Sequence, residues 1–434
     1  MRKLAAILMA LSLIASTATA AKAPKYYVDS AKLPFAALPG VSSQRLWGVL
    51  NGAGYRIEVP DNWNGSLVLW AHGFRGTGLE LTVDDHPLRS YLVANGYAWA
   101  ASSYSKNGYD ALAAAKDTHT LRSLFIDKFG APSRIYLSGA SMGGHVVALA
   151  AEKWPTSYSG ATSICGWLGD AKQFDFYLDF AVAAQTLSGV GALFPYGSDY
   201  LTTTVPATKA ALGPTFPFVL NASGLNLKSL TQLRSGGVRP VFDQGWLYWN
   251  GVVPGDFMFG TLGLLGQPLP AENAGVTYQF DTDPALSASE AAFNATVQRV
   301  TASETARRKF TPVTGNLRIP MLTLHTLGDL FSPFVVEQIY AERVAAQGAS
   351  DLLVQRATRD FGHCAFTPTE LVTGFNDLVQ WVEGGVKPAG DDVLDPAAVA
   401  SPTFGCQFTD TTAPRLWTTN AQLAFLAPPA CPVN

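Results

Sequence analysis

Short apolar runs alternate with longer amphipathic segments along most of this chain. Runs with the length and composition of buried strands occur at residues 66–71, 97–102, 134–137, 159–165, 320–324 and 352–356. Segments with the apolar spacing of helices occur at residues 87–95, 112–129, 144–153, 333–347 and 367–383. Ahead of them, residues 47–59 indicate an early hairpin around Asn51-Gly52-Ala53-Gly54. This alternation predicts an α/β fold with a mostly parallel central sheet flanked by helices.

A glycine-flanked serine lies between the strand at residues 134–137 and the helix at residues 144–153. Residues 139–143 are Gly-Ala-Ser-Met-Gly, which fits G-x-S-x-G with Ser141 at its centre. Bulky side chains at the two flanking positions would clash in a tight turn between strand and helix, so glycine is needed there. We therefore predict that Ser141 is a catalytic nucleophile on a sharp strand-to-helix turn.

A serine hydroxyl needs a base, and the base needs an orienting acid, both expected further along the chain. Asp329 and His363 each follow a predicted strand, and one helix and one strand separate them. Because the carboxyl ends of parallel strands meet at one edge of a sheet, we expect these two side chains to lie together. Asp281 and Asp283 are rival acids, but no strand-then-helix pattern follows them. The other histidines are expected to be structural: His72, His86, His119, His145 and His325.

These residues resemble landmarks of the α/β-hydrolase superfamily, over most of the chain from about residue 48 to 385 except its middle segment. The resemblance rests on His72-Gly73-Phe74, the Ser141 turn, Gly328-Asp329 and Gly362-His363. It implies the α/β-hydrolase fold and an oxyanion hole with backbone N–H donors from Phe74 and Met142. Acyl transfer places negative charge on a carbonyl oxygen, and each such donor is worth about 2.7–4 kcal/mol.

The residue after the predicted base adds a second resemblance. His363-Cys364 is similar to the pair in tannases and feruloyl esterases, which carry a cysteine just after the catalytic histidine. In those enzymes another cysteine precedes the nucleophile, where this chain has Ala140. Phenolic esters are therefore one option among the substrates.

Residues 167–311 interrupt the alternation of strands and helices. The interval is too long for a loop inside a compact domain, so we expect an inserted, aromatic-rich lid. A lid over Ser141 would form the roof of the substrate pocket, with a wall from Trp246, Tyr248 and Trp249. The predicted catalytic domain consists of residues 21–166 and 312–385. A C-terminal arm is expected at residues 386–434.

The first residues of the chain predict export. Arg2 and Lys3 precede an apolar stretch at residues 4–15, and Ala18-Thr19-Ala20 fits a cleavage site, so residues 1–20 are expected to be a signal peptide. The apolar stretch is too short for a membrane span. With 434 residues, 48% of them hydrophobic, the chain can bury a large core, and its net charge of −3 argues against nucleic-acid binding. We expect a secreted or periplasmic protein.

Four cysteines can cross-link such an exported chain: Cys165, Cys364, Cys406 and Cys431. An even number favours disulfides, with three possible pairings. Cys165 ends a predicted strand near the active-site edge and Cys364 follows the predicted base. We therefore favour Cys165–Cys364 together with Cys406–Cys431. One bridge with two free thiols is the alternative.

Together these patterns predict a secreted serine hydrolase that cleaves carboxylic esters through an acyl-enzyme. His363 would take the proton of Ser141, and Asp329 would orient the imidazole. The reaction requires no cofactor or metal, and the substrate is expected to be a small-molecule or polymeric ester. Three alternatives stay open: a peptidase or amidase with the same triad, an extracellular polyester depolymerase, and a binding module on an inactive hydrolase fold.

Overall fold

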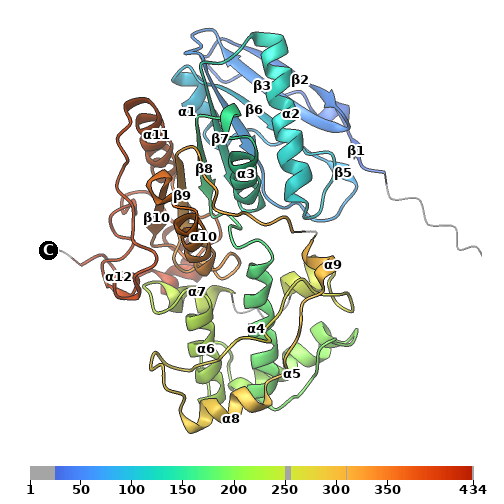
Figure 1. The fold of residues 1–434 in the computed structure, drawn as a ribbon, viewed down its shortest axis with the longest axis vertical. Helices are drawn as coiled ribbons and strands as arrows, with labels where there is room; N and C mark the ends of the chain where they lie inside the picture. The colour runs from blue at the N-terminus through green and yellow to red at the C-terminus, as the bar shows by residue number, and fades with distance from the viewer. Residues whose placement is uncertain (1–24, 250–255, 309, 433–434) are drawn as a thin grey trace, which may run out of the picture.

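The centre of the structure, a computed structural model, is an eight-stranded sheet (Figure 1). The structure describes residues 25–249, 256–308 and 310–432, so the predicted signal peptide at residues 1–20 lies outside the described residues. The strands are β2 (Ser43–Leu50), β3 (Ala53–Pro60), β4 (Ser66–Ala71), β6 (Ala98–Ser102), β7 (Arg134–Ala140), β8 (Gly160–Ile164), β9 (Met321–Thr326) and β10 (Leu353–Thr358).

The order of these strands across the sheet is β10-β9-β8-β7-β4-β6-β3-β2. β2 pairs antiparallel with β3, and β3 pairs antiparallel with β6. All other neighbours in the sheet are parallel. A separate two-stranded sheet joins β1 (Tyr27–Val28) to β5 (Glu80–Leu81). The predicted fold class, a mostly parallel sheet within an α/β architecture, is confirmed.

Helices cover both faces of the sheet (Figure 1). One face packs against α2 (Ala111–Phe129), α3 (Met142–Lys153) and α10 (Val335–Ala346), and the other against α1 (Arg89–Ala94) and α11 (Pro368–Gly384). Strand β4 shows the division, because Leu67 and Leu69 belong to the first core and Val68 and Trp70 to the second. A strand buried on both faces has a continuous apolar sequence, which explains the unbroken runs.

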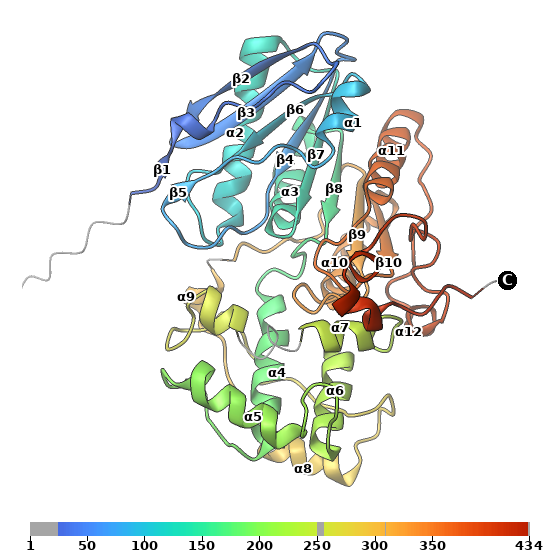
Figure 2. The same cartoon turned by 180° about the vertical axis from the view of Figure 1, so that it is seen from behind.

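The residues between β8 and β9 form a helical group beyond one end of the sheet, as Figures 1 and 2 both show. Its helices are α4 (Lys172–Ser188), α5 (Val205–Leu212), α6 (Ala222–Arg234), α7 (Phe242–Trp249), α8 (Ala288–Thr296) and α9 (Glu304–Arg307), with π-helical turns at Tyr200–Thr204 and Asp256–Thr261. α4 is buried at every position from Gln173 to Gln185, so the other segments pack around it. The assignment of residues 167–311 as a lid stays a prediction.

The C-terminal residues wrap around the sheet edge at β10 as short helical turns. These are α12 (Pro396–Ala400), α13 (Leu416–Thr419) and a 3₁₀ turn at Ala421–Leu426; three further 3₁₀ turns lie at Ser30–Lys32, Pro155–Ser157 and Ser350–Leu352. Val393, Phe404 and Leu426 of this segment are buried against the residues that follow β9 and β10. Among the helices of the described part of the chain, none has the length and hydropathy needed to cross a membrane.

Candidate active site

Ser141 occupies the sharp turn between β7 and α3. β7 ends at Ala140 and α3 begins at Met142, two residues earlier than the sequence pattern predicts. Ser141 has φ 57° and ψ −125°, a backbone conformation that a residue other than glycine rarely adopts. Such strain persists only where the surrounding structure enforces it, and it is the geometry that exposes a nucleophile at the end of a strand.

Two glycines permit this turn because other backbone passes close to them. A Cβ atom at Gly139 would overlap the carbonyl of Gly143, on the first turn of α3. A Cβ atom at Gly143 would overlap the carbonyl oxygen of Ala71, at the end of β4, and would lie 2.8 Å from the carbonyl oxygen of His72. The loop that follows β4 is thus packed directly on the start of α3.

The predicted nucleophile, base and acid form one hydrogen-bonded chain. The Nε2 atom of His363 lies 2.8 Å from the Oγ atom of Ser141, and its Nδ1 atom lies 2.6 Å from the Oδ2 atom of Asp329. Asp329 is fully buried, and its Oδ1 atom accepts the backbone N–H groups of Phe331 at 2.8 Å and Ser332 at 2.9 Å. The carboxylate is therefore fixed in orientation before it meets the imidazole. The rival acids at positions 281 and 283 are exposed in the inserted segment.

His72 supports the loop next to this chain. Its ring is buried, stacks on Tyr104 with centroids 4.0 Å apart, and its Nδ1 atom lies 2.7 Å from the carbonyl oxygen of Gly73. Burial, with a smaller contribution from the charge of Arg75, lowers the pKa of His72 to about 3. A neutral His72 donates from Nδ1 to that carbonyl, which agrees with its predicted structural role.

The loop held by His72 passes beside the nucleophile. A Cβ atom at Gly73 would lie 3.1 Å from the Cβ atom of Ser141. Phe74 follows on this loop, and Met142 is the first residue of α3, where a backbone N–H has no partner within its own helix. This placement is compatible with the two predicted oxyanion donors, whose role stays a prediction.

Replacing Gly143 by alanine tests the packing of this loop on α3. The added methyl group would displace the backbone at Ala71, so the loop that carries the predicted oxyanion donor Phe74 would shift, and we expect kcat to fall by about 100-fold, as for the loss of one oxyanion donor. Steady-state kinetics and thermal unfolding followed by circular dichroism would measure the effect. Gly384→Ala is the control, because a Cβ atom there meets nothing within 4 Å. An unchanged kcat in folded Gly143→Ala would contradict this packing.

A disulfide connects the loop of the base to the sheet. Cys165, directly after β8, is bonded to Cys364 with their Cα atoms 5.2 Å apart, and Cys406 is bonded to Cys431 with a Cα–Cα distance of 5.8 Å. Both bridges are those favoured from the sequence. Cys165, His363 and Cys364 are also the group of possible metal ligands found among the described residues. Because both sulfur atoms are in the disulfide, they are not available as thiolate ligands.

Aromatic rings lie against the base. The edge of the Phe331 ring meets the His363 ring with centroids 4.8 Å apart, and Trp249 stacks on Phe331 at 5.7 Å. The indole N–H of Trp249 donates to the carbonyl oxygen of Phe361 at 2.6 Å. Sequence reasoning missed Phe331. The sequence feature that could have identified Phe331 is its position two residues after Asp329, on the same loop.

The other two predicted wall residues, Tyr248 and Trp246, pack on other neighbours. Tyr248 packs its ring on Phe361 with centroids 4.8 Å apart. Trp246 is 3% exposed, and its indole N–H donates at 3.3 Å to the carbonyl oxygen of Pro217, inside the core of the inserted segment. This burial argues against direct contact between Trp246 and a substrate. Of the three residues, Trp249 is the one placed beside an aromatic neighbour of His363.

Helix α7, which carries these residues, meets the acid loop (residues 327–334) through its backbone as well as through the ring of Trp249. A Cβ atom at Gly245 would overlap the carbonyl of Gly328, the residue before Asp329. A Cβ atom at Gly328 would in turn lie 2.8 Å from the carbonyl oxygen of Val241 and 2.9 Å from the Cα atom of Phe361. The helix, the acid loop and the base loop therefore meet at a glycine contact that has no room for side chains.

His325, which the sequence analysis expected to be structural, supports the loop of Asp329. It is fully buried, and its Nε2 atom lies 2.8 Å from the carbonyl oxygen of Ser332 on the acid loop. Its Nδ1 atom faces the carboxylate of Glu337 at 3.3 Å. Burial lowers the pKa of His325, but the hydrogen bond and the charge of Glu337 outweigh it, so the net pKa is raised. A charged His325 would donate to Ser332 and so hold the loop that fixes Asp329.

Comparison with known proteins gives weak sequence similarity. No family model matches the chain. It is 24% identical over 420 residues to an o-phthalyl amidase of Xanthobacter agilis, covering 81% of this chain and 90% of the amidase. Among solved structures, it is similar to feruloyl esterase B from Aspergillus oryzae (TM-score 0.46, 14% identity, 83% of this chain and 85% of that one). An esterase from Aspergillus oryzae gives a TM-score of 0.43 at 16% identity, with 81% of each chain covered.

Proposed function

This chain has the α/β-hydrolase fold, and on that premise we propose that it is a serine hydrolase that cleaves carboxylic esters through an acyl-enzyme. One observation carries the proposal: the hydrogen-bonded chain from the Ser141 hydroxyl through His363 to the buried Asp329. An imidazole with a carboxylate on Nδ1 presents an unprotonated Nε2 to the hydroxyl, which is what a base needs.

In the first half of the reaction the ester acylates the serine. His363 takes the proton from Ser141 while the Oγ atom attacks the ester carbonyl carbon, and Asp329 stabilises the imidazolium that forms. The carbonyl oxygen becomes an oxyanion, which the backbone N–H groups of Phe74 and Met142 would hold. His363 then gives its proton to the departing alkoxide, so the alcohol leaves and the acyl group stays on Ser141.

In the second half, water takes the place of the alcohol. His363 removes a proton from this water, which attacks the acyl carbon and forms a second oxyanion at the same place. When that intermediate collapses, the proton on His363 returns to Ser141 and the carboxylic acid is released. Each group ends the cycle in its starting state, so no cofactor is consumed.

The aromatic residues beside the base support an apolar substrate group. Phe331 contacts the ring of His363, and Trp249 stacks on Phe331. Apolar walls with a few polar groups are typical of small-molecule sites. We propose that an apolar or aromatic part of the ester lies against these rings. A polymeric ester would present the same group, so a polyester depolymerase is a variant of this proposal.

An amidase is the second candidate, favoured by the similarity to o-phthalyl amidase over most of both chains. The same three residues would serve, with His363 protonating an amine in place of an alcohol. We rank the ester first because an alkoxide leaves a tetrahedral intermediate more readily than an amide anion, so an amide depends more strongly on protonation of its leaving nitrogen. Export of the protein is part of the proposal and is supported by the two disulfides, which persist in oxidising compartments.

Matched chromogenic substrates test the choice between ester and amide. We expect p-nitrophenyl esters from acetate to palmitate to be hydrolysed, with kcat/KM highest at the acyl length that fits the site. The p-nitroanilides of the same acids should be hydrolysed far more slowly. Faster hydrolysis of the anilides would establish the amidase instead. If the folded protein hydrolysed neither series, the proposed function would be wrong.

A further inference from the structure

The loop between β10 and α11 carries His363 and has two anchors on the sheet. The Cys165–Cys364 disulfide fixes it immediately after the base. The hydroxyl of Thr326, at the end of β9, donates to the carbonyl oxygen of Gly362 at 2.8 Å, immediately before the base. One anchor directly follows β8 and the other is the last residue of β9, and both precede the loop in the sequence.

Asp360, at the start of this loop, joins it to the acid loop. Its carbonyl oxygen accepts the backbone N–H of Gly328 at 2.9 Å, one residue before Asp329. Its carboxylate accepts the backbone N–H of Gly362 at 2.8 Å, one residue before His363. A displacement of Asp360 would therefore change the position of the acid relative to the base.

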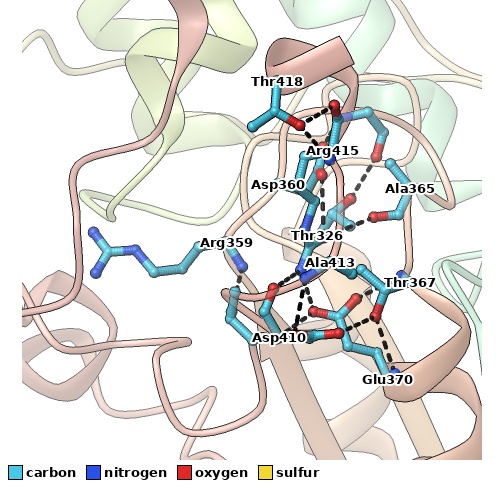
Figure 3. Close-up of polar contacts among 12 residues, drawn as sticks. Thr326, Arg359, Asp360, Ala365, Thr367, Glu370, Asp410, Ala413, Arg415 and Thr418 are labelled. Atoms are coloured by element: carbon cyan, nitrogen blue, oxygen red, sulfur yellow. Dashed lines mark hydrogen bonds and ion pairs between the residues drawn. The ribbon is translucent and has the colours of Figure 1, made fainter.

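The C-terminal segment supplies a third anchor, whose polar contacts Figure 3 shows. One guanidinium nitrogen of Arg415, Nη1, donates to the carboxylate of Asp360 at 3.2 Å and to the carbonyl oxygen of Ala365 at 3.3 Å. These two acceptors lie on either side of His363 in the sequence, so a single side chain bridges both ends of the base loop. The other nitrogen, Nη2, donates to the carboxylate of Glu370 and to the carbonyl oxygen of Asp410 at 2.9 Å.

The contacts of Arg415 with Asp360 and Glu370 are buried and charged, so their loss would destabilise this part of the protein. The side chain of Arg415 is 6% exposed, and those of Asp360 and Glu370 are 2% exposed. Removing the cation would take from two buried carboxylates the counter-ion that they share. Loss of one partner from a buried ion pair is strongly destabilising, because the remaining charge stays desolvated. The base loop would move to bring the carboxylate of Asp360 to water.

We propose that Arg415 is a positioning residue for the base: from the C-terminal segment it holds both ends of the loop that carries His363, and through Asp360 it sets the distance between His363 and Asp329. This inference rests on the proposed function. It makes the C-terminal segment around Arg415 part of the support of the catalytic centre.

Arg415→Ala and Arg415→Lys test the proposal with two readouts. The first is the rate at which a fluorophosphonate labels Ser141, which needs His363 as a base but no natural substrate. The second is the split between kcat and KM on the best p-nitrophenyl ester. We expect Arg415→Ala to lower the labelling rate and kcat on the order of 100-fold, as a displacement of about 1 Å would, with KM unchanged. Arg415→Lys should retain part of the labelling rate and part of kcat, because lysine keeps the positive charge.

Arg356→Ala is the matched control. Its side chain is 4% exposed, pairs with Asp377 at 2.6 Å and donates to the carbonyl oxygen of Ala389 at 3.0 Å, so it also ties the C-terminal segment to the sheet edge. The Arg356→Ala variant should be less stable than the wild-type protein, and its Ser141 should be labelled at the wild-type rate. The labelling rate of Ser141 and the stability are compared between Arg415→Ala and Arg356→Ala. If the labelling rate fell in both variants, and only in proportion to the stability lost, Arg415 would be a structural residue and the inference would be wrong.

Two further outcomes separate the inference from the proposed function. If the wild-type protein is labelled and folded Arg415→Ala is labelled at the same rate, the positioning role alone is overturned. If the wild-type protein is not labelled, both the positioning role and the proposed function are wrong. Should Arg415→Ala fail to fold, Asp360→Asn replaces it, since an amide oxygen still accepts from Gly362 while the charge that pairs with Arg415 is lost. That variant should show the same loss of labelling.

Discussion

Replacing Ser141 by alanine should lower kcat by about 10⁶-fold and leave the protein folded. The hydroxyl is the atom that would form the acyl-enzyme, and its nearest polar partner in the structure is the imidazole of His363 at 2.8 Å. Without the hydroxyl, water must attack the ester directly, and the remaining rate comes from substrate binding and the oxyanion donors. Methyl for hydroxymethyl removes few contacts, so the unfolding temperature should change little.

The measurement for Ser141→Ala is hydrolysis of the best ester under single-turnover and steady-state conditions. Ser163→Ala is the control: this serine is buried, lies close to α3 and Gly166, and its hydroxyl has no hydrogen-bond partner among the described residues. It should keep full activity. Turnover retained in Ser141→Ala would disprove the acyl-enzyme mechanism.

Replacing Asp329 by asparagine should lower kcat by about 10⁴-fold without unfolding the protein. The Oδ1 atom of Asp329 accepts two backbone N–H groups, so the carbonyl oxygen of an asparagine would take that place. Its NH₂ group would then face the Nδ1 atom of His363, which becomes an acceptor. The proton of the neutral ring moves to Nε2, and Nε2 can no longer receive the proton of Ser141.

The control for Asp329→Asn is Asp281→Asn, which removes one of the rival acids. Asp281 is exposed in the inserted segment, so its replacement should leave kcat unchanged. The pH profile of kcat/KM adds a second criterion, because Asp329→Asn should recover activity only at high pH, where hydroxide replaces the missing base. Near-normal kcat in Asp329→Asn at neutral pH would exclude Asp329 as the orienting acid.

The strands of the sheet and the positions of Ser141, Asp329 and His363 could be predicted, because each depends on local sequence. Val68 and Leu69 are both apolar, since each faces a different helical layer, so β4 was visible as an unbroken run. The turn at Ser141 could be predicted because the residues two positions before and two positions after it must be glycine. The positions of Asp329 and His363 follow from the rule that consecutive parallel strands end at one edge.

What could not be predicted depends on which side of a helix faces which partner. Trp246 and Trp249 are three residues apart on α7 and were predicted to share one wall. Trp246 instead enters the core of the inserted segment, while Trp249 reaches the base loop. Arg415 offered no signal, because its meaning comes from Asp360 and Glu370, which lie 55 and 45 residues away in the sequence.

The glycine contact between α7 and the acid loop limits how the inserted segment could be exchanged between related enzymes. By sequence α7 belongs to the insert, but its backbone at Gly245 touches Gly328 and its Trp249 bonds the base loop. A cassette covering residues 167–311 would therefore carry part of the support of the catalytic centre with it. A graft intended to alter substrate preference should keep residues 241–249 and replace helices farther from the sheet, such as α5 and α8 (Figure 2).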